Sequence, residues 1–180
     1  LGLSLFAFRH YQERSVRMLL DAAKDLPITV VIKPQFAEDY FSWVAFANKE
    51  FPGCKVEVTR ASEDYFKLLQ ECDAMALCNW SSTLIEAGIA NVPVLYLEFE
   101  EQNSVRIARL AASGLCEVVR DVISLKAAFS KLCEKTRARN FPRELTIQQE
   151  YYLGNLDGNA TERVTQFIME SIKDPARVTF

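Results

Sequence analysis

The amino-acid sequence predicts an α/β domain built on a doubly wound, parallel sheet of six strands. Short apolar runs alternate with helical patterns along the chain. The run at residues 28–32 is continuous and β-branched, as in strands buried on both faces. Proline, glycine and asparagine separate runs from helices. Right-handed crossovers between such elements give one parallel sheet.

Each element follows from a local pattern. The predicted strands are the apolar runs at residues 1–8, 28–32, 55–59, 74–78, 94–97 and 116–119. Apolar residues three or four positions apart predict helices at residues 12–26, 40–51, 65–72, 82–90, 105–112, 125–132 and 160–171. Pro27, Pro52-Gly53, Asn91 and Gly114 mark helix ends. Residues 135–150 are polar and arginine-rich, which is typical of a solvated connection.

Length and composition favour a single domain over residues 1–180. A 20.5 kDa chain with 49% apolar residues can bury one core of this kind, and two full domains would have little room. Residues 1–8 lie inside an apolar run without a preceding cap, and the first residue is not methionine. We therefore expect the chain to be a piece of a longer protein.

The composition argues against several classes of function. A net charge of -3 and a pI near 5.3 disfavour a nucleic-acid partner. No apolar run reaches the ~18 residues of a membrane span, so no transmembrane segment is predicted. The five cysteines form no C-x-x-C pair and His10 is the one histidine. We therefore expect reduced thiols of a cytosolic protein, and neither a metal site nor a cofactor.

The most informative stretch is a strand at residues 74–78, a turn with three hydroxyls, a short helix and a strand from Val94. Ligands of open α/β sheets bind beyond the carboxyl ends of the strands. A helix start favours an anion, so Ser81, Ser82 and Thr83 are candidates to hold a diphosphate. Thr83 to Glu86 also matches a capping box, in which Glu86 only satisfies the helix start. The residues alone leave both interpretations open.

Basic and aromatic residues follow neighbouring strands. Lys33 and Arg60 could bind the same anion through charge-assisted hydrogen bonds, or each could lie solvated on the surface. Trp80 could stack on a base or cover the edge of the core. The sequence has no G-x-G-x-x-G after its first predicted strand, no G-x-x-x-x-G-K-[ST] and no G-x-S-x-G. Hydride transfer, kinase and serine hydrolase chemistry are therefore disfavoured.

Three groups of residues together resemble the carboxyl-terminal, donor-binding domain of GT-B fold glycosyltransferases. The first combines Cys72-Asp73 with residues 81–87 and residues 91–95. The second, residues 31–34, is similar to the Lys-Pro-His-Pro loop of capsule and teichoic-acid polymerases of the CDP-glycerol transferase type, with Gln35 in place of histidine. The third, residues 157–164, looks like the Asp-Gly-Lys-Ala-Ser-Glu-Arg-Ile segment of those enzymes and of UDP-N-acetylglucosamine 2-epimerases.

This resemblance implies a Rossmann-like, nucleotide-sugar donor-binding domain, one half of a GT-B fold whose amino-terminal, acceptor-binding half belongs to the same protein. The residues implied to hold the donor diphosphate are Ser81, Ser82, Thr83 and Lys33. Those implied to bind ribose and base are Glu86, Arg60 and Ser62, and further candidates are His10, Asp157 and Arg163. No catalytic residue is assigned.

The implied activity is transfer of a sugar or polyol phosphate from a nucleotide-activated donor, during synthesis of a bacterial surface polysaccharide such as capsule. The donor is then a substrate, and no metal or cofactor is expected. The parent enzyme would be cytoplasmic, with peripheral association at the inner face of the membrane compatible with the family. Two alternatives stay open: a sugar-nucleotide 2-epimerase domain, and a non-catalytic α/β binding module in which Thr83 and Glu86 only cap their helix.

Overall fold

The computed structural model of this chain describes residues 2–34, 38–99, 105–134 and 145–173, with side chains from Tyr11 to Glu170 within these ranges. The chain divides into two compact units, Leu1–Arg139 and Asn140–Phe180. Among the described residues, strands occur only in the first unit.

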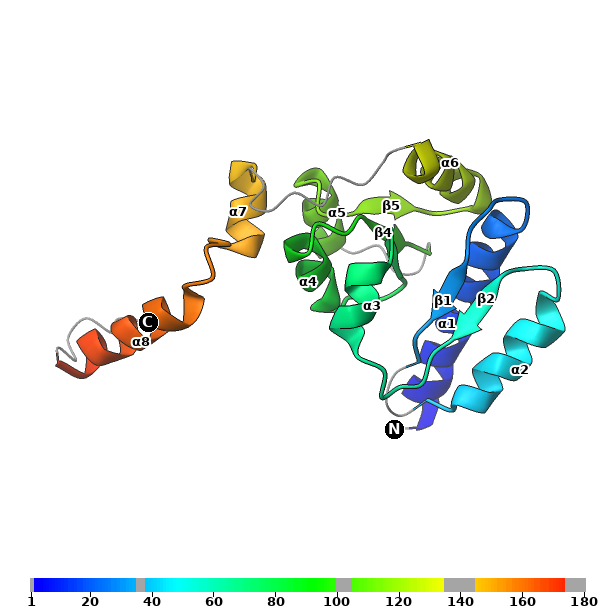
Figure 1. Ribbon diagram of the computed structural model, residues 1–180, viewed down its shortest axis with the longest axis horizontal. Helices are drawn as coiled ribbons and strands as arrows, with labels where there is room; N and C mark the ends of the chain where they lie inside the picture. The colour runs from blue at the N-terminus through cyan, green and yellow to red at the C-terminus, as the bar shows by residue number, and fades with distance from the viewer. Residues whose placement is uncertain (1, 35–37, 100–104, 135–144, 174–180) are drawn as a thin grey trace. The chain divides into compact units, whose positions relative to one another are not determined.

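Helices and strands alternate along the first unit, which confirms the predicted α/β class (Figure 1). Its elements are α1 (Gly2–Ala23), β1 (Val30–Ile32), α2 (Tyr40–Glu50), β2 (Val56–Val58), α3 (Tyr65–Glu71), β3 (Met75–Leu77), α4 (Thr83–Ile89), β4 (Val94–Leu97), α5 (Val105–Ala112), β5 (Glu117–Val119) and α6 (Val122–Glu134). Asp39 and Asp64 cap α2 and α3 by accepting backbone N–H bonds.

The five strands of the described residues form two parallel sheets, and a six-stranded sheet is not among them. β1 pairs with β2, with Val30 opposite Val56. The second sheet has the order β3-β4-β5, with Met75 opposite Val94 and Leu95 opposite Glu117. The parallel direction agrees with the prediction, and a helix connects the two strands of each pair: α2 for β1 and β2, α4 for β3 and β4, and α5 for β4 and β5.

The strand predicted at residues 1–8 is wrong, because residues 2–8 belong to the long helix α1. Leucine, alanine and phenylalanine are compatible with a helix, and no proline or glycine separates residues 3–11 from the helix predicted to begin at Gln12. The helical pattern of the later residues therefore continues to the start of the chain. This difference removes the sixth strand from the sheet.

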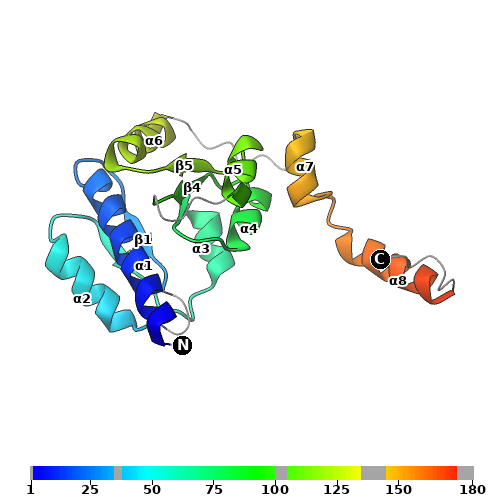
Figure 2. The same cartoon turned by 180° about the vertical axis from the view of Figure 1, so that it is seen from behind.

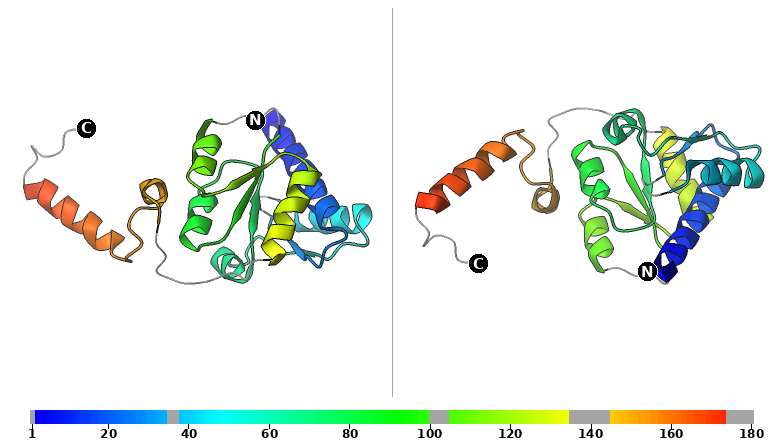
Figure 3. Two further views of the ribbon diagram at one scale, coloured as in Figure 1. Left: turned by 90° about the horizontal axis from the view of Figure 1, so that it is seen from above. Right: turned by 90° about the horizontal axis from the view of Figure 1, so that it is seen from below.

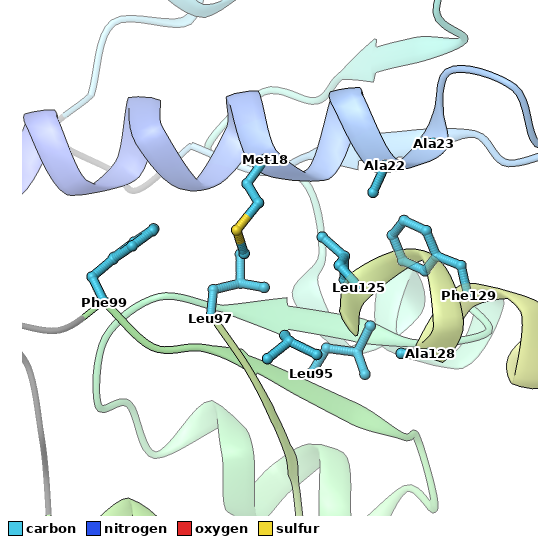
Figure 4. Packing of buried hydrophobic residues seen from close by; sticks show 10 residues of the cluster. Met18, Ala22, Ala23, Leu95, Leu97, Phe99, Leu125, Ala128 and Phe129 are labelled. Carbon is cyan, nitrogen blue, oxygen red and sulfur yellow. The ribbon is translucent and has the colours of Figure 1, made fainter. Parts of the chain in front are cut away.

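Helix α1 packs on both sheets. Met18, Ala22 and Ala23 contact Leu95 and Leu97 of β4 together with residues of α6 (Figure 4). Val16 and Leu20 instead join a second cluster with Ile32 of β1 and Trp43 of α2. Figure 3 shows the two sheets on different sides of α1, and Figure 2 shows α6, which contacts α1, from behind. One amphipathic helix thus holds the unit together.

The second unit consists of α7 (Ile147–Leu153) and α8 (Ala160–Lys173) among the described residues. α7 begins inside the predicted connection, at a capping box in which Thr146 and Gln149 exchange side-chain to backbone hydrogen bonds of 3.2 and 3.3 Å. Residues 135–144 of that connection lie outside the described residues. Gly158, at φ +80°, lies in the turn before α8, a backbone conformation that favours glycine.

Candidate functional site

The carboxyl ends of β3, β4 and β5 lie at one edge of their parallel sheet, where polar residues follow each strand. Asn79 to Thr83 come after β3, Glu98 follows β4 and Arg120 follows β5. Because ligands of such sheets bind at this edge, it is the candidate site of the molecule.

The hydroxyl turn serves its own helix in part. The Ser81 hydroxyl oxygen accepts the Thr83 backbone N–H at 3.3 Å and the Thr83 hydroxyl at 2.9 Å. Ser82 occupies the N-cap position in helical conformation, is exposed and makes no side-chain capping bond. The capping box predicted for Thr83 to Glu86 is therefore wrong, because the chain is already helical one residue earlier. Ser82 is therefore exposed, and its hydroxyl does not cap the helix.

Tyr65 of α3 is hydrogen-bonded to the first residue of α4. Its hydroxyl donates to the Thr83 carbonyl oxygen at 3.4 Å and lies 3.6 Å from the Met75 sulfur. Burial, followed by the nearby carboxylate of Glu86, raises the pKa of Tyr65 to about 12. The phenol is therefore a neutral donor at physiological pH, and it fixes α4 against β3.

An aromatic ring and a guanidinium lie together beside this turn. Trp80 is 44% exposed, and the Arg106 guanidinium carbon of α5 lies 4.7 Å from the centroid of the Trp80 ring. This is a cation–π contact, worth about 0.5–1 kcal/mol at an exposed site. Arg106 of α5 thus places a positive charge beside the turn that contains Trp80 and Ser82. An anion at Ser82 could interact with this charge as well as with backbone N–H groups.

A buried carboxylate lies at the end of the central strand. The Glu98 side chain is only 8% exposed, and its Oε2 lies 2.6 Å from Nη2 of Arg120, which is 68% exposed. Burial and then Glu98 raise the pKa of the Cys116 thiol to about 11. Cys116 is thus a thiol at neutral pH, and Glu98 is paired with the solvent-accessible Arg120.

The residues predicted to bind base and phosphate from the first sheet lie near one another. The Lys33 ammonium donates to the Ala61 carbonyl oxygen at 2.9 Å, which ties it to the loop between Arg60 and Ser62. The Arg60 guanidinium carbon lies 5.7 Å from the centroid of the Tyr40 ring, and Ser62 is exposed. Lys33, Arg60 and Ser62 therefore follow strands of the β1–β2 sheet, whereas Ser81, Ser82, Thr83 and Glu86 follow β3 of the other sheet.

The remaining predicted site residues lie elsewhere. Asp157 and Arg163 belong to the second unit, where Nη1 of Arg163 lies 2.7 Å from both carboxylate oxygens of Asp157. The side chain of His10 and residue Gln35 fall outside the described parts of the chain. Asp157 and Arg163 are thus engaged with each other.

Sequence reasoning missed three residues of the candidate site, Tyr65, Arg106 and Arg120, and it selected Glu98 as a strand-end position without giving it a role. Glu98 and Arg120 each come directly after a predicted strand, so the strand-end rule that selected Lys33 also applies to them. Arg106 and Tyr65 lie on helices, and no local pattern distinguishes them from other surface residues. Their positions depend on how α3 and α5 pack.

Among the described residues, no group of three or more histidine, cysteine, aspartate or glutamate side chains could hold a metal ion. The five cysteines are free thiols. None of the helices in the described ranges is both long and apolar enough to cross a membrane. Comparisons with models of protein families, with curated proteins and with solved structures found no match for this chain.

Proposed function

We propose that this chain is the donor-binding part of a glycosyltransferase and holds the diphosphate of a nucleotide-activated sugar at the carboxyl edge of its parallel strands. The observation that carries the proposal is the group of polar residues at the ends of β3, β4 and β5, where exposed Ser82 lies next to the Trp80–Arg106 pair. Hydroxyl donors and an arginine suit a diphosphate, and an exposed aromatic ring suits a base. The sequence resemblance described above adds the reaction class.

The finer parts of the proposal follow from that resemblance. The donor would transfer a sugar or polyol phosphate during synthesis of a bacterial surface polysaccharide, with an acceptor-binding domain supplied by the same protein. Glu86, Arg60 and Ser62 would contact ribose and base, and Lys33 the phosphates. We also propose that the two parallel sheets belong to one doubly wound sheet, since that arrangement would bring Lys33 and Ser82 to a common edge.

Calorimetric titration of the whole chain with UDP, CDP, GDP and their activated sugars tests the proposal. We expect one nucleotide to bind, and Ser82→Ala to weaken it roughly tenfold, because a hydrogen bond to a charged oxygen is worth about 1.5 kcal/mol or more. Ser130→Ala is the matched control, since its exposed hydroxyl lies on α6. Absence of binding by every nucleotide, or equal affinity of the two variants, would count against the proposal.

A second candidate is a non-catalytic α/β module. The observation in its favour is that the Ser81 hydroxyl is engaged with Thr83, so part of the hydroxyl turn has a structural role. Ser81→Ala separates the two: in a plain module it lowers stability only, whereas in a donor site it also lowers nucleotide affinity.

A further inference from the structure

The edge strands β1 and β3, one from each sheet, have backbone N–H and C=O groups that point away from the strand with which each is paired. In β1 the Val30 N–H donates to Lys55 at 2.9 Å and the Ile32 carbonyl accepts from Thr59 at 3.0 Å, so both residues face β2. Successive residues of a strand direct their backbone N–H and C=O groups to opposite sides, so those of Val31 point away from β2.

β3 repeats this arrangement on the other sheet. Its Met75 N–H donates to the Pro93 carbonyl oxygen at 2.9 Å, so Met75 and Leu77 face β4 and the backbone of Ala76 points away from it. Strand edges of this kind are templates for a further strand. Val31, although β-branched and in a continuous apolar run, is 45% exposed.

Both edges border the same core. Val30 of β1 and Ala76 of β3 pack against one cluster, which contains Met18 and Ala22 of α1. α1 also packs on Ile32 of β1 in the second cluster, so this helix reaches both sheets. A strand between β1 and β3 would therefore border a core to which α1 already contributes.

Chain topology identifies which residues can fill this position. The order β2-β1-x-β3-β4-β5 is that of a doubly wound sheet whose first strand, x, is central. α1 leads into β1, so a right-handed crossover requires x to precede α1. The residues there, Leu3 to Phe8, include five apolar side chains, as is typical of a buried central strand.

We propose that residues 3–8 have a second state, a central parallel strand between β1 and β3, with α1 then beginning near Gln12. In that state the two sheets become one sheet of six strands, and the amides of Val31 and Ala76 gain partners. This inference rests on the proposal above that the two sheets belong to one doubly wound sheet. Its test does not involve a nucleotide, so the strand state and the nucleotide-binding function can fail separately.

Amide hydrogen exchange of the whole chain, followed by NMR, tests the strand directly. We expect the amides of Val31 and Ala76 to exchange about tenfold more slowly than the amide of Val58, because they are paired whenever the strand state is populated. Val58 is the matched control, because its amide points to the outer edge of β2 in either state. Exchange of Val31 and Ala76 as fast as Val58 would overturn the proposal.

A proline at residue 4 distinguishes the two states of the segment. In the helix Ser4 lies in the first turn, where the N–H has no intrahelical partner and proline is tolerated. In a central strand the same proline removes a ladder bond. We expect Ser4→Pro to lose the protection of Val31 and Ala76 by about tenfold or more, or to unfold, whereas Ser4→Ala stays as the parent. Equal behaviour of the two variants would overturn the proposal.

Discussion

Strand β4 of the β3–β4–β5 sheet and strand β1 of the β1–β2 pair are both continuous apolar runs, but they are buried to different degrees. All four residues of β4 are buried, whereas β1 and β2 have exposed positions and Ile32 alone is buried. β4 has a strand on each side, and β1 has one neighbour among the described strands. Burial of a strand is therefore set by its neighbours in space and not by the composition of its run. The residues at the strand ends differ in the same direction, since Glu98 after β4 is buried, whereas Lys33 after β1 is half-buried and Arg60 after β2 is exposed.

Shortening one side chain in each sheet should give the largest difference in the free energy of unfolding. Leu97 of β4 is 1% exposed, so Leu97→Ala should lower the free energy of unfolding by about 2–5 kcal/mol through lost burial and a cavity. Val58→Ala in half-buried β2 should cost about 1 kcal/mol or less. Urea denaturation of both variants measures the contrast. Equal losses would mean that the two sheets are buried alike in solution.

Two ion pairs provide the next comparison. Arg120 pairs with buried Glu98, whereas Lys131 pairs with Glu117 at 3.3 Å and both partners are exposed. Arg120→Ala should lower the free energy of unfolding by about 1–2 kcal/mol, because it leaves a buried carboxylate without its arginine. Solvent access to Arg120 keeps this below the cost of a fully buried pair.

Lys131→Ala is the matched control and should change the free energy of unfolding by less than about 0.5 kcal/mol. Urea midpoints at neutral pH measure both variants. If Lys131→Ala destabilised the protein more than Arg120→Ala, the burial of Glu98 would not explain the loss of stability at the end of β4.

The sequence predicted well what depends on local periodicity. The helices at residues 40–51, 125–132 and 160–171, and the strands at 94–97 and 116–119, were located within a few residues, because apolar spacing and turn residues act over one or two turns. Residues 1–8 were different. Their apolar run fits a strand or a helix, and the choice depends on contacts with distant residues.

The candidate site residues remain predictions, and they were selected by a local rule. Ser82 and Lys33 became candidates because each lies shortly after a strand, which is a local property. Which strands share a sheet is not local, so the separation of Lys33 from Ser82 could not be read from the chain. Arg106 also depends on packing, since it reaches Trp80 only through the position of α5.

Tyr65 tests how firmly the candidate turn is held on its sheet. Tyr65→Phe should lower the free energy of unfolding by about 0.5–1.5 kcal/mol through loss of its bond to Thr83. Because the folded pKa is raised to about 12 from 10.0, the contribution of this phenol is fully present below pH 10 and is lost as the pH rises through 12. Denaturation at pH 8 and pH 11 measures it.

The control for this variant is Tyr151→Phe, which changes an exposed tyrosine. Its stability should match the parent at both pH values. A similar loss in Tyr151→Phe, or a Tyr65 phenol that titrates near pH 10 by ultraviolet absorbance, would contradict a buried, hydrogen-bonded hydroxyl behind α4.

The turn before α8 gives the smallest expected effect, because the Asp157–Arg163 pair is accessible to solvent and the described part of its unit contains only helices. The bond from Arg163, then the Asn159 backbone N–H, hold the pKa of Asp157 below its ordinary value. This contribution is present above about pH 4 and is lost as the pH falls through the lowered pKa. Circular dichroism between pH 5 and pH 2 should show a helical loss in the parent that Asp157→Asn already shows at pH 5. Asp73→Asn, at an exposed carboxylate of the first unit, should follow the parent. If Asp157→Asn also followed the parent, the Asp157–Arg163 pair would not stabilise α8, and its strength would be that of an ordinary surface pair.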